Sequence, residues 1–114
     1  MIDQTGYEKA AQATLDRIQR TLDDEVDPDV VEAIPSSGVV RLDWQGSRRD
    51  WVVNSQSAAR QIWLAAEQRA WHFAPEGEDP ASVRWVCAKS GDELFATITG
   101  LLREHAQLEV DFGS

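Results

Sequence analysis

The most informative part of this sequence reads Asn54-Ser55-Gln56-Ser57-Ala58-Ala59-Arg60-Gln61-Ile62-Trp63-Leu64-Ala65. In its second half, Ile62 and Leu64 would share one face of a β-strand, which turns Gln61 and Trp63 toward the other face. A Trp on the outer face is unusual, because its side chain can bury about 150 to 250 Å² and often anchors an interface. The segment therefore predicts a strand over 61–65 that presents a contact residue to solvent.

Short runs rich in Val, Ile and Trp flank this segment and predict further strands. Turn residues separate the runs, so we expect about six strands, over 30–34, 39–44, 48–54, 61–65, 71–74 and 83–87. Every connection between them is short. Short connections favour antiparallel neighbours in one sheet.

A helix is predicted on either side of the strands. The first begins at a capping box, Thr5-Gly6-Tyr7-Glu8, and ends before Pro28. Its apolar stripe at helical spacing is Tyr7, Ala11, Leu15, Ile18 and Leu22. A second capping box, Ser90-Gly91-Asp92-Glu93, begins the last helix, whose stripe is Leu94, Phe95, Ile98, Leu101, Leu102 and His105. This order predicts an α+β fold in which both helices cover one face of an antiparallel sheet.

Length and composition limit the class of protein. A chain of 114 residues has room for one domain, expected over 1–114. Twenty acidic against eleven basic residues give a charge of -9, which argues against binding to nucleic acid or to anionic membranes. A single cysteine excludes an internal disulfide framework and a cysteine-based metal cage. Without a leader pattern or a membrane span in the sequence, we expect a cytoplasmic protein.

The negative charge is concentrated in one short segment. Six carboxylates and no basic residue lie within ten positions, and they account for two-thirds of the net charge. These residues are Asp23, Asp24, Glu25, Asp27, Asp29 and Glu32. Two of them fall in the last turn of the first predicted helix, where carboxylates oppose the helix dipole. Their placement there suggests that the charge serves a binding function.

The sequence resembles the bacterial frataxin family of the CyaY type. The resemblance rests on the 54–65 segment, on Trp71-His72-Phe73 and on Trp85-Val86-Cys87-Ala88-Lys89-Ser90-Gly91, together with the acidic segment after the first helix. It extends over nearly the whole chain, from about Gly6 to Phe112, in the same order and at similar spacing. It implies a two-layer sandwich of two helices on one face of a sheet, which agrees with the fold predicted from periodicity.

The resemblance also implies a function. Frataxins carry an acidic ridge that binds iron weakly and docks on a basic patch of the cysteine desulfurase of iron–sulfur assembly. In this sequence the ridge corresponds to the six carboxylates named above, with Asp23 and Asp24 as docking residues. Trp63, Gln61 and Asn54 correspond to the sheet-face contact with the desulfurase and the iron–sulfur scaffold protein. We therefore expect a non-enzymatic regulator that is a monomer and could form oligomers with metal.

The sequence departs from the family pattern at three places. Gln19 and Arg20 stand where relatives usually have further acids, which shortens the ridge. Ala58 replaces the usual loop proline, and Arg69-Ala70 replaces a Gly-Gly pair before the fifth strand. These changes bear on the shape of the loops and on docking.

Exposed carboxylates are hard oxygen donors that suit Fe2+ and Fe3+, calcium, magnesium or manganese. Affinity should be weak, because no closed cage is expected. Two other functions fit the same residues: an iron-oxidising or iron-storing protein, or an acidic adaptor for another basic partner. A solvated acidic face without a ligand is the simplest alternative.

The remaining reactive residues indicate packing. Cys87 lies at strand spacing from Trp85 and is expected to be a buried apolar residue. The ring of His72 should face away from the side of its neighbours Trp71 and Phe73. His105 ends the stripe of the last helix, and two distant histidines argue against a catalytic triad or a histidine metal cage. Core packing is expected of Trp44, Trp51, Trp71 and Trp85.

Overall fold

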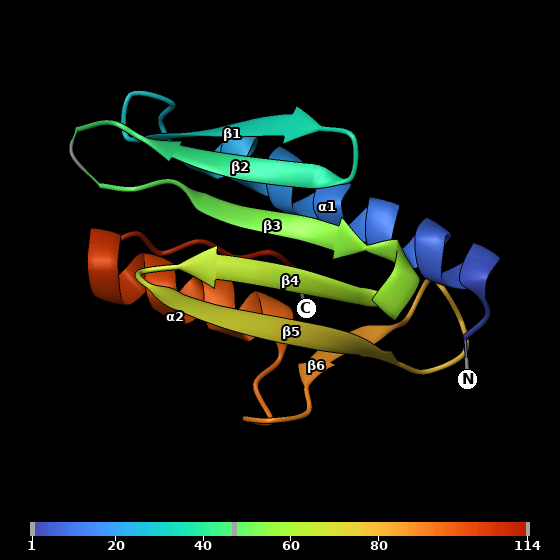
Figure 1. The fold of residues 1–114 in the computed structure, drawn as a ribbon. Coiled ribbons are helices and arrows are strands. Elements are labelled where there is room, and N and C mark those ends of the chain that lie inside the picture. The colour runs from blue at the N-terminus through green and yellow to red at the C-terminus, as the bar shows by residue number, and fades with distance from the viewer. Residues whose placement is uncertain (1, 47, 114) are drawn as a thin grey trace.

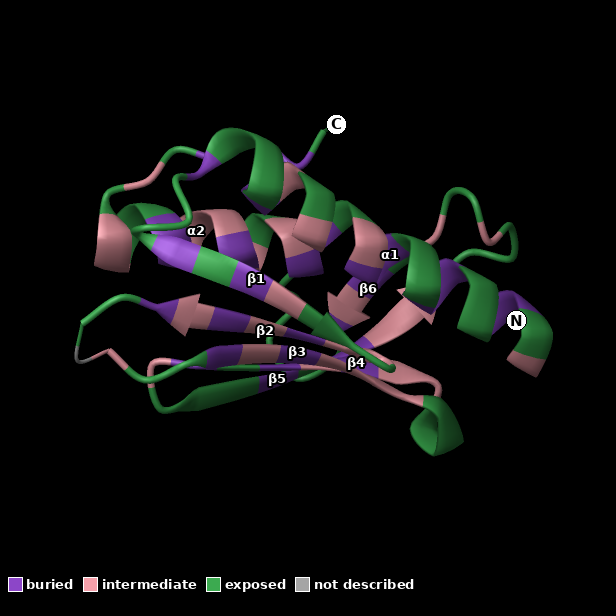
Figure 2. Cartoon of the chain, turned by 90° about the horizontal axis from the view of Figure 1, so that it is seen from above, coloured by how far each residue is buried: buried purple, intermediate pink, exposed green. Residues whose placement is uncertain are grey.

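The computed structural model describes residues 2–46 and 48–113 (Figure 1). Two helices, one short 3-10 turn and six strands follow one another along the chain. Their bounds are α1 Gln4–Glu25, β1 Val31–Ser36, β2 Val39–Trp44, β3 Trp51–Gln56, η1 Ser57–Ala59, β4 Gln61–Ala66, β5 Arg69–Glu76, β6 Arg84–Cys87 and α2 Leu94–Ala106. The strands form one antiparallel sheet in chain order, β1 to β6, and both helices lie on one face of it (Figure 2). The predicted α+β two-layer sandwich is confirmed.

Helix α1 begins two residues earlier in the chain than predicted. Asp3 is the N-cap, and its Oδ1 accepts a hydrogen bond from the backbone N–H of Gly6 at 2.7 Å. The capping box expected at Thr5 is therefore wrong, since Thr5 lies inside the helix. Asp3 lies three residues before Gly6, the spacing at which an N-cap side chain reaches a free backbone N–H. Its negative charge also suits the positive end of the helix dipole. The helix ends at Glu25, three residues before Pro28, as the proline predicts.

Helix α2 begins one residue after the predicted box, with Glu93 itself as the cap. The Glu93 carboxylate accepts from the backbone N–H groups of Phe95 and Ala96, both at 3.0 Å. The box expected at Ser90 is wrong, because one carboxylate satisfies both free donors. The helix ends at Ala106. The C-cap Gln107 has a left-handed backbone (φ 54°), and its N–H donates to carbonyls of the last turn.

The predicted strands are correct in number and order but differ in their ends. Strand β2 has the predicted bounds, whereas β5 is longer at both ends. Strand β3 begins at Trp51 and not at Arg48, because its pairing with β2 ends at Leu42 and Trp51. The Arg48 side chain instead donates to Glu67 and to the carbonyl of His105. Ser47, in the predicted turn between β2 and β3, lies outside the described residues.

The core lies between the helices and the inner face of the sheet (Figure 2). Every residue of the predicted stripe of α1 is buried, as are Trp44, Trp51, Trp71 and Trp85. The Trp85 indole N–H donates to Thr14 Oγ1 on α1 at 2.9 Å, so this buried polar group keeps a partner. Cys87 is also buried, as expected. In the described part of the chain, neither helix has the length and apolar character that a bilayer crossing requires.

The segment after α2, residues 107–113, completes the core without regular structure. Val110 and Phe112 are buried, and the Phe112 ring packs against Phe95 with centroids 5.6 Å apart. Arg17 of α1 donates from Nε to the Phe112 carbonyl and lies over the Phe95 ring. Residues 107–113 thus pack against both helices.

Candidate functional site

The six predicted acidic residues are all exposed, and we call this stretch the acidic segment: Asp23, Asp24, Glu25, Asp27, Asp29 and Glu32. The first three lie in the last turn of α1, the next two in the turn after it, and Glu32 on β1. Fixed elements position both ends of the segment. Leu22 and Val26 are buried beside it, and Val31 anchors the start of β1 in the core. The sequence forms this surface because apolar anchors alternate with exposed acids.

Local contacts shape the acidic segment. Asp27 Oδ1 accepts from the backbone N–H of Asp29 at 2.8 Å, which closes the turn between α1 and β1. Glu25 Oε1 accepts from the N–H of Asp111 at 3.2 Å and ties the segment to the end of the chain. Within residues 2–46 and 48–113, no three His, Cys, Asp or Glu side chains gather in a way that could enclose a metal ion. The surface therefore offers carboxylates side by side and not a preformed cage.

Two further acids adjoin this surface, and the sequence did not single them out. Asp43 on β2 is the direct cross-strand partner of Glu32 on β1. Asp50, just before β3, receives a hydrogen bond from Arg41 Nη1 at 2.7 Å, and Asp43 lies 3.8 Å from the same nitrogen. The hairpin register would have revealed the pairing, because residues 32 and 43 are both outward positions on neighbouring strands. Acidic side chains thus continue from α1 onto the outer face of the sheet, where Arg41 balances part of their charge.

Trp63 lies on the outer face of the sheet, as predicted, opposite Asn54 on β3 and His72 on β5. Its indole N–H donates to the side-chain oxygen of Gln61 at 2.8 Å. His72 is exposed while Trp71 and Phe73 are buried, which confirms the predicted direction of its ring. The structure brings the three predicted contact residues together and adds His72, whose pairing with Trp63 needed the β4–β5 register.

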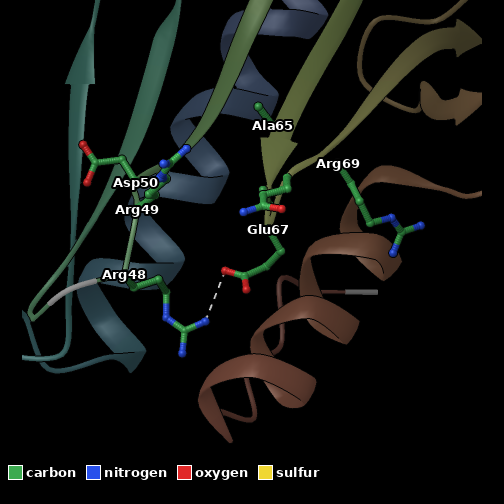
Figure 3. Close-up of a pocket in the computed structure, with 8 residues that line it drawn as sticks. Arg48, Arg49, Asp50, Ala65, Glu67 and Arg69 are labelled. Carbon is green, nitrogen blue, oxygen red and sulfur yellow. Dashed lines mark hydrogen bonds and ion pairs between the residues drawn. The ribbon is translucent and has the colours of Figure 1, made fainter.

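A cavity of about 290 Å³ opens where β3 begins and the β4–β5 hairpin turns (Figure 3). Glu67, one of the residues that line it, accepts from the Trp51 indole N–H at 2.9 Å and from Arg48 at 3.1 Å. Its carboxylate lies 3.2 Å from His105 Nδ1. The Trp51 hydrogen bond is the main reason that the pKa of Glu67 is lowered, with Arg48 and His105 adding to it. This cluster fastens the end of α2 to the sheet.

The Arg69-Ala70 departure lies beside the same hairpin. The Arg69 guanidinium lies 4.4 Å from the centroid of the Trp71 ring. In Figure 3 its side chain points away from Arg48 and Glu67. The substitution therefore covers a core Trp without entering the Glu67 cluster.

Comparisons with known proteins agree with this architecture. The family model described as a frataxin-like domain matches residues 1–108. A protein of Herminiimonas arsenicoxydans, named iron-sulfur cluster assembly protein CyaY, is 28% identical over 109 residues, covering 94% of this chain and 93% of that protein. A CyaY of Cupriavidus pinatubonensis is 30% identical over 102 residues, covering 87% of this chain and 86% of that protein.

A solved structure has the same fold. The frataxin from Psychromonas ingrahamii, of the CyaY protein family, superimposes with a TM-score of 0.77 at 20% sequence identity, and the match covers 100% of both chains. At 20% identity, this likeness shows a shared fold alone. Because the family model spans nearly the whole chain, the two-helix, six-strand protein described above belongs to the frataxin-like family, in its bacterial CyaY form.

Proposed function

We propose that this chain acts in iron–sulfur cluster assembly, as a non-enzymatic regulator that binds iron weakly and docks on a cysteine desulfurase and its scaffold protein. The observation that carries the proposal is the name shared by its relatives, iron-sulfur cluster assembly protein CyaY, in proteins that align over most of their length. The acidic segment and the Trp63 face are the surfaces to which we assign the two activities.

The chemistry of the acidic segment supports weak cation binding. Its ligands are all carboxylate oxygens, which are hard donors and accept ferric and ferrous iron as well as other hard cations. Neighbouring carboxylates on one helix turn can share a partly hydrated ion. With no three ligands gathered among the described residues, most of the coordination shell would remain water. We expect low affinity and little selectivity among metals.

The same charge supports docking on a basic partner. A row of like charges raises the association rate and orients the encounter, and salt screens it over about 8 Å at physiological ionic strength. Trp63, half-buried between Asn54 and His72, offers an aromatic anchor on the adjoining face. The acidic segment would steer the partner, and Trp63 would hold it.

The test is a titration of isotope-labelled protein with purified cysteine desulfurase and, separately, with iron, following the backbone signals by NMR. We expect the signals of residues 23–32 to move in both titrations, and those near Trp63 only with the desulfurase. A triple variant, Asp23→Asn, Asp24→Asn and Asp27→Asn, should weaken both and flatten the salt dependence of binding. Signals of 23–32 that stay still in both titrations would refute the site assignment.

A matched control removes the same charge elsewhere. Glu76→Gln, Asp92→Asn and Glu104→Gln are exposed positions outside the acidic segment and leave the overall charge equal to that of the triple variant. The control should bind as the unmodified protein does. Oxygen uptake by the purified protein with Fe2+, abolished by the triple variant and not by the control, would instead indicate iron oxidation.

A further inference from the structure

The loop between β3 and β4 is held by side chains from the start of α1. The Gln4 amide nitrogen donates to Ser57 Oγ at 2.7 Å and to the Ser57 carbonyl at 3.3 Å. Arg60 donates from Nε to Gln4 Oε1 at 2.9 Å and from Nη1 to the carbonyl of Ile2 at 3.2 Å. Ser57 Oγ also donates to Glu8 Oε1 at 3.2 Å. Gln4 therefore donates hydrogen bonds to the loop, and Arg60 and Ser57 of the loop donate hydrogen bonds back to residues 2–8.

Tyr7 fixes both ends of the same loop. Its hydroxyl donates to the backbone carbonyl of Gln61 at 2.7 Å and lies 2.6 Å from Ser55 Oγ. Because the single hydroxyl proton is used on Gln61, Ser55 supplies the proton of the second bond. The ring is buried and packs edge-on against Trp85, so it cannot shift without disturbing the core.

These contacts lead directly to the sheet-face aromatic residue. Tyr7 holds the main chain of Gln61, and the Gln61 side chain accepts the hydrogen bond from the Trp63 indole. Arg60, next to Gln61, has a left-handed backbone (φ 52°) that costs energy for a residue with a Cβ. Its two side-chain hydrogen bonds offset that cost. The loop has Ala58 where a proline is usual in the family. Hydrogen bonds from side chains therefore restrict the loop backbone, in place of a proline ring.

We propose that Gln4, Tyr7 and Arg60 are positioning residues that hold Gln61 and Trp63 in the orientation their partner recognises. The inference rests on the proposed docking function and adds to it the part of the molecule that sets the geometry. The first turn of α1 itself need not contact the partner. It lowers the ordering cost of binding, because the contact residues are already fixed before the encounter.

The decisive variant is Arg60→Gly, which removes the side-chain bonds while suiting the left-handed backbone. We expect desulfurase binding to weaken about 3- to 10-fold, mainly through faster dissociation. The Trp63 indole N–H signal should broaden or shift, with little change in melting temperature. Gln4→Ala should act in the same direction, and Arg60→Lys should recover part of the affinity. Arg84→Ala, an equal change of charge at an exposed position on β6, serves as the matched control and should bind normally.

Trp63→Ala separates this inference from the function on which it rests. If Trp63→Ala weakens binding while Arg60→Gly and Gln4→Ala bind normally, the positioning role is refuted and the docking function stands. If Trp63→Ala also binds normally, the sheet face is not a contact, which refutes both the positioning role and the part of docking assigned to Trp63 and leaves docking through the acidic segment. A Trp63 indole signal that is unchanged in Arg60→Gly would likewise refute the positioning role.

Discussion

The Trp63 indole lies flat on the His72 imidazole, with ring centroids 4.1 Å apart and planes inclined by 12°. The two rings come from neighbouring strands and face solvent together, outside the core. Stacked aromatic pairs contribute about 0.5 to 1.5 kcal/mol beyond the area they bury. The pair is therefore a preorganised aromatic surface whose removal should affect binding more than folding.

The first prediction separates these two effects. Trp63→Ala should lower the free energy of unfolding by about 0.5 to 1.5 kcal/mol through the lost stack, in addition to the loss from its half-buried area. Trp51→Ala, in the core and 1% exposed, should cost about 3 to 5 kcal/mol. Urea unfolding of both variants measures the difference. Equal losses would mean that Trp63 is a core residue and not a surface one.

The second prediction concerns Glu67 and pH. Its pKa is lowered in the folded protein from a usual value of 4.5. A lowered folded pKa stabilises the fold above the unfolded value, and this stabilisation is lost as pH falls through the folded pKa. Glu67→Gln should therefore lower the free energy of unfolding by about 1.5 to 3 kcal/mol at pH 7, the value of hydrogen bonds to a charged group.

The difference between Glu67→Gln and the unmodified protein should shrink below about pH 4.5. Glu109→Gln is the control, because Glu109 also pairs with an arginine, Arg103, but is 70% exposed. Its effect should be smaller, since water screens the pair. Chemical unfolding from pH 3.5 to 7 measures both variants. A Glu67→Gln loss that stays constant over this range would contradict the assignment.

The third prediction concerns the acidic segment and salt. Asp23 and Asp24 lie in the last turn of α1, where each exposed carboxylate opposes the dipole by about 0.3 to 1 kcal/mol at low ionic strength. Replacing both by Asn should raise the melting temperature in dilute buffer. Added salt or divalent cations should raise that of the unmodified protein more than that of the variant. A melting temperature of the unmodified protein that ignores salt would count against repulsion in the segment.

The fourth prediction concerns the end of the chain. Phe112 is 4% exposed and joins Phe95 and Arg17, so Phe112→Ala should cost about 3 to 5 kcal/mol. Asp111→Asn, next to it and exposed, should leave the free energy of unfolding within about 0.5 kcal/mol. Thermal and urea unfolding compare the two. A small effect of Phe112→Ala would show that the last residues only rest on the surface.

The sequence predicted those features that repeat along the chain. Alternation placed Trp63 outward and Ile62 inward, and helical spacing gave the buried stripe of α1, because both patterns depend on the local backbone period. It missed Asp3 and Glu93 as caps. Several nearby side chains can reach the same free N–H groups, and only the fold decides which of them does.

The missed contacts join residues far apart in the chain. Arg48 bonds to Glu67 and His105, 19 and 57 residues away, and no local pattern reports such a bond. The same applies to Arg60 and Gln4, separated by 56 residues. The acidic segment was found because it is contiguous. Asp43 and Asp50 were missed because they join it through the sheet register.

The strand order β1 to β6 has a consequence for how the chain folds. Each strand pairs with the next one along the chain, so the sheet can grow by successive hairpins at little loop-closure cost. Contacts of very long range join α1 to residues 107–113, such as Arg17 with Phe112, 95 residues apart. We expect these to form after the transition state for folding. Changes at Phe112 should then accelerate unfolding and leave the refolding rate nearly unchanged.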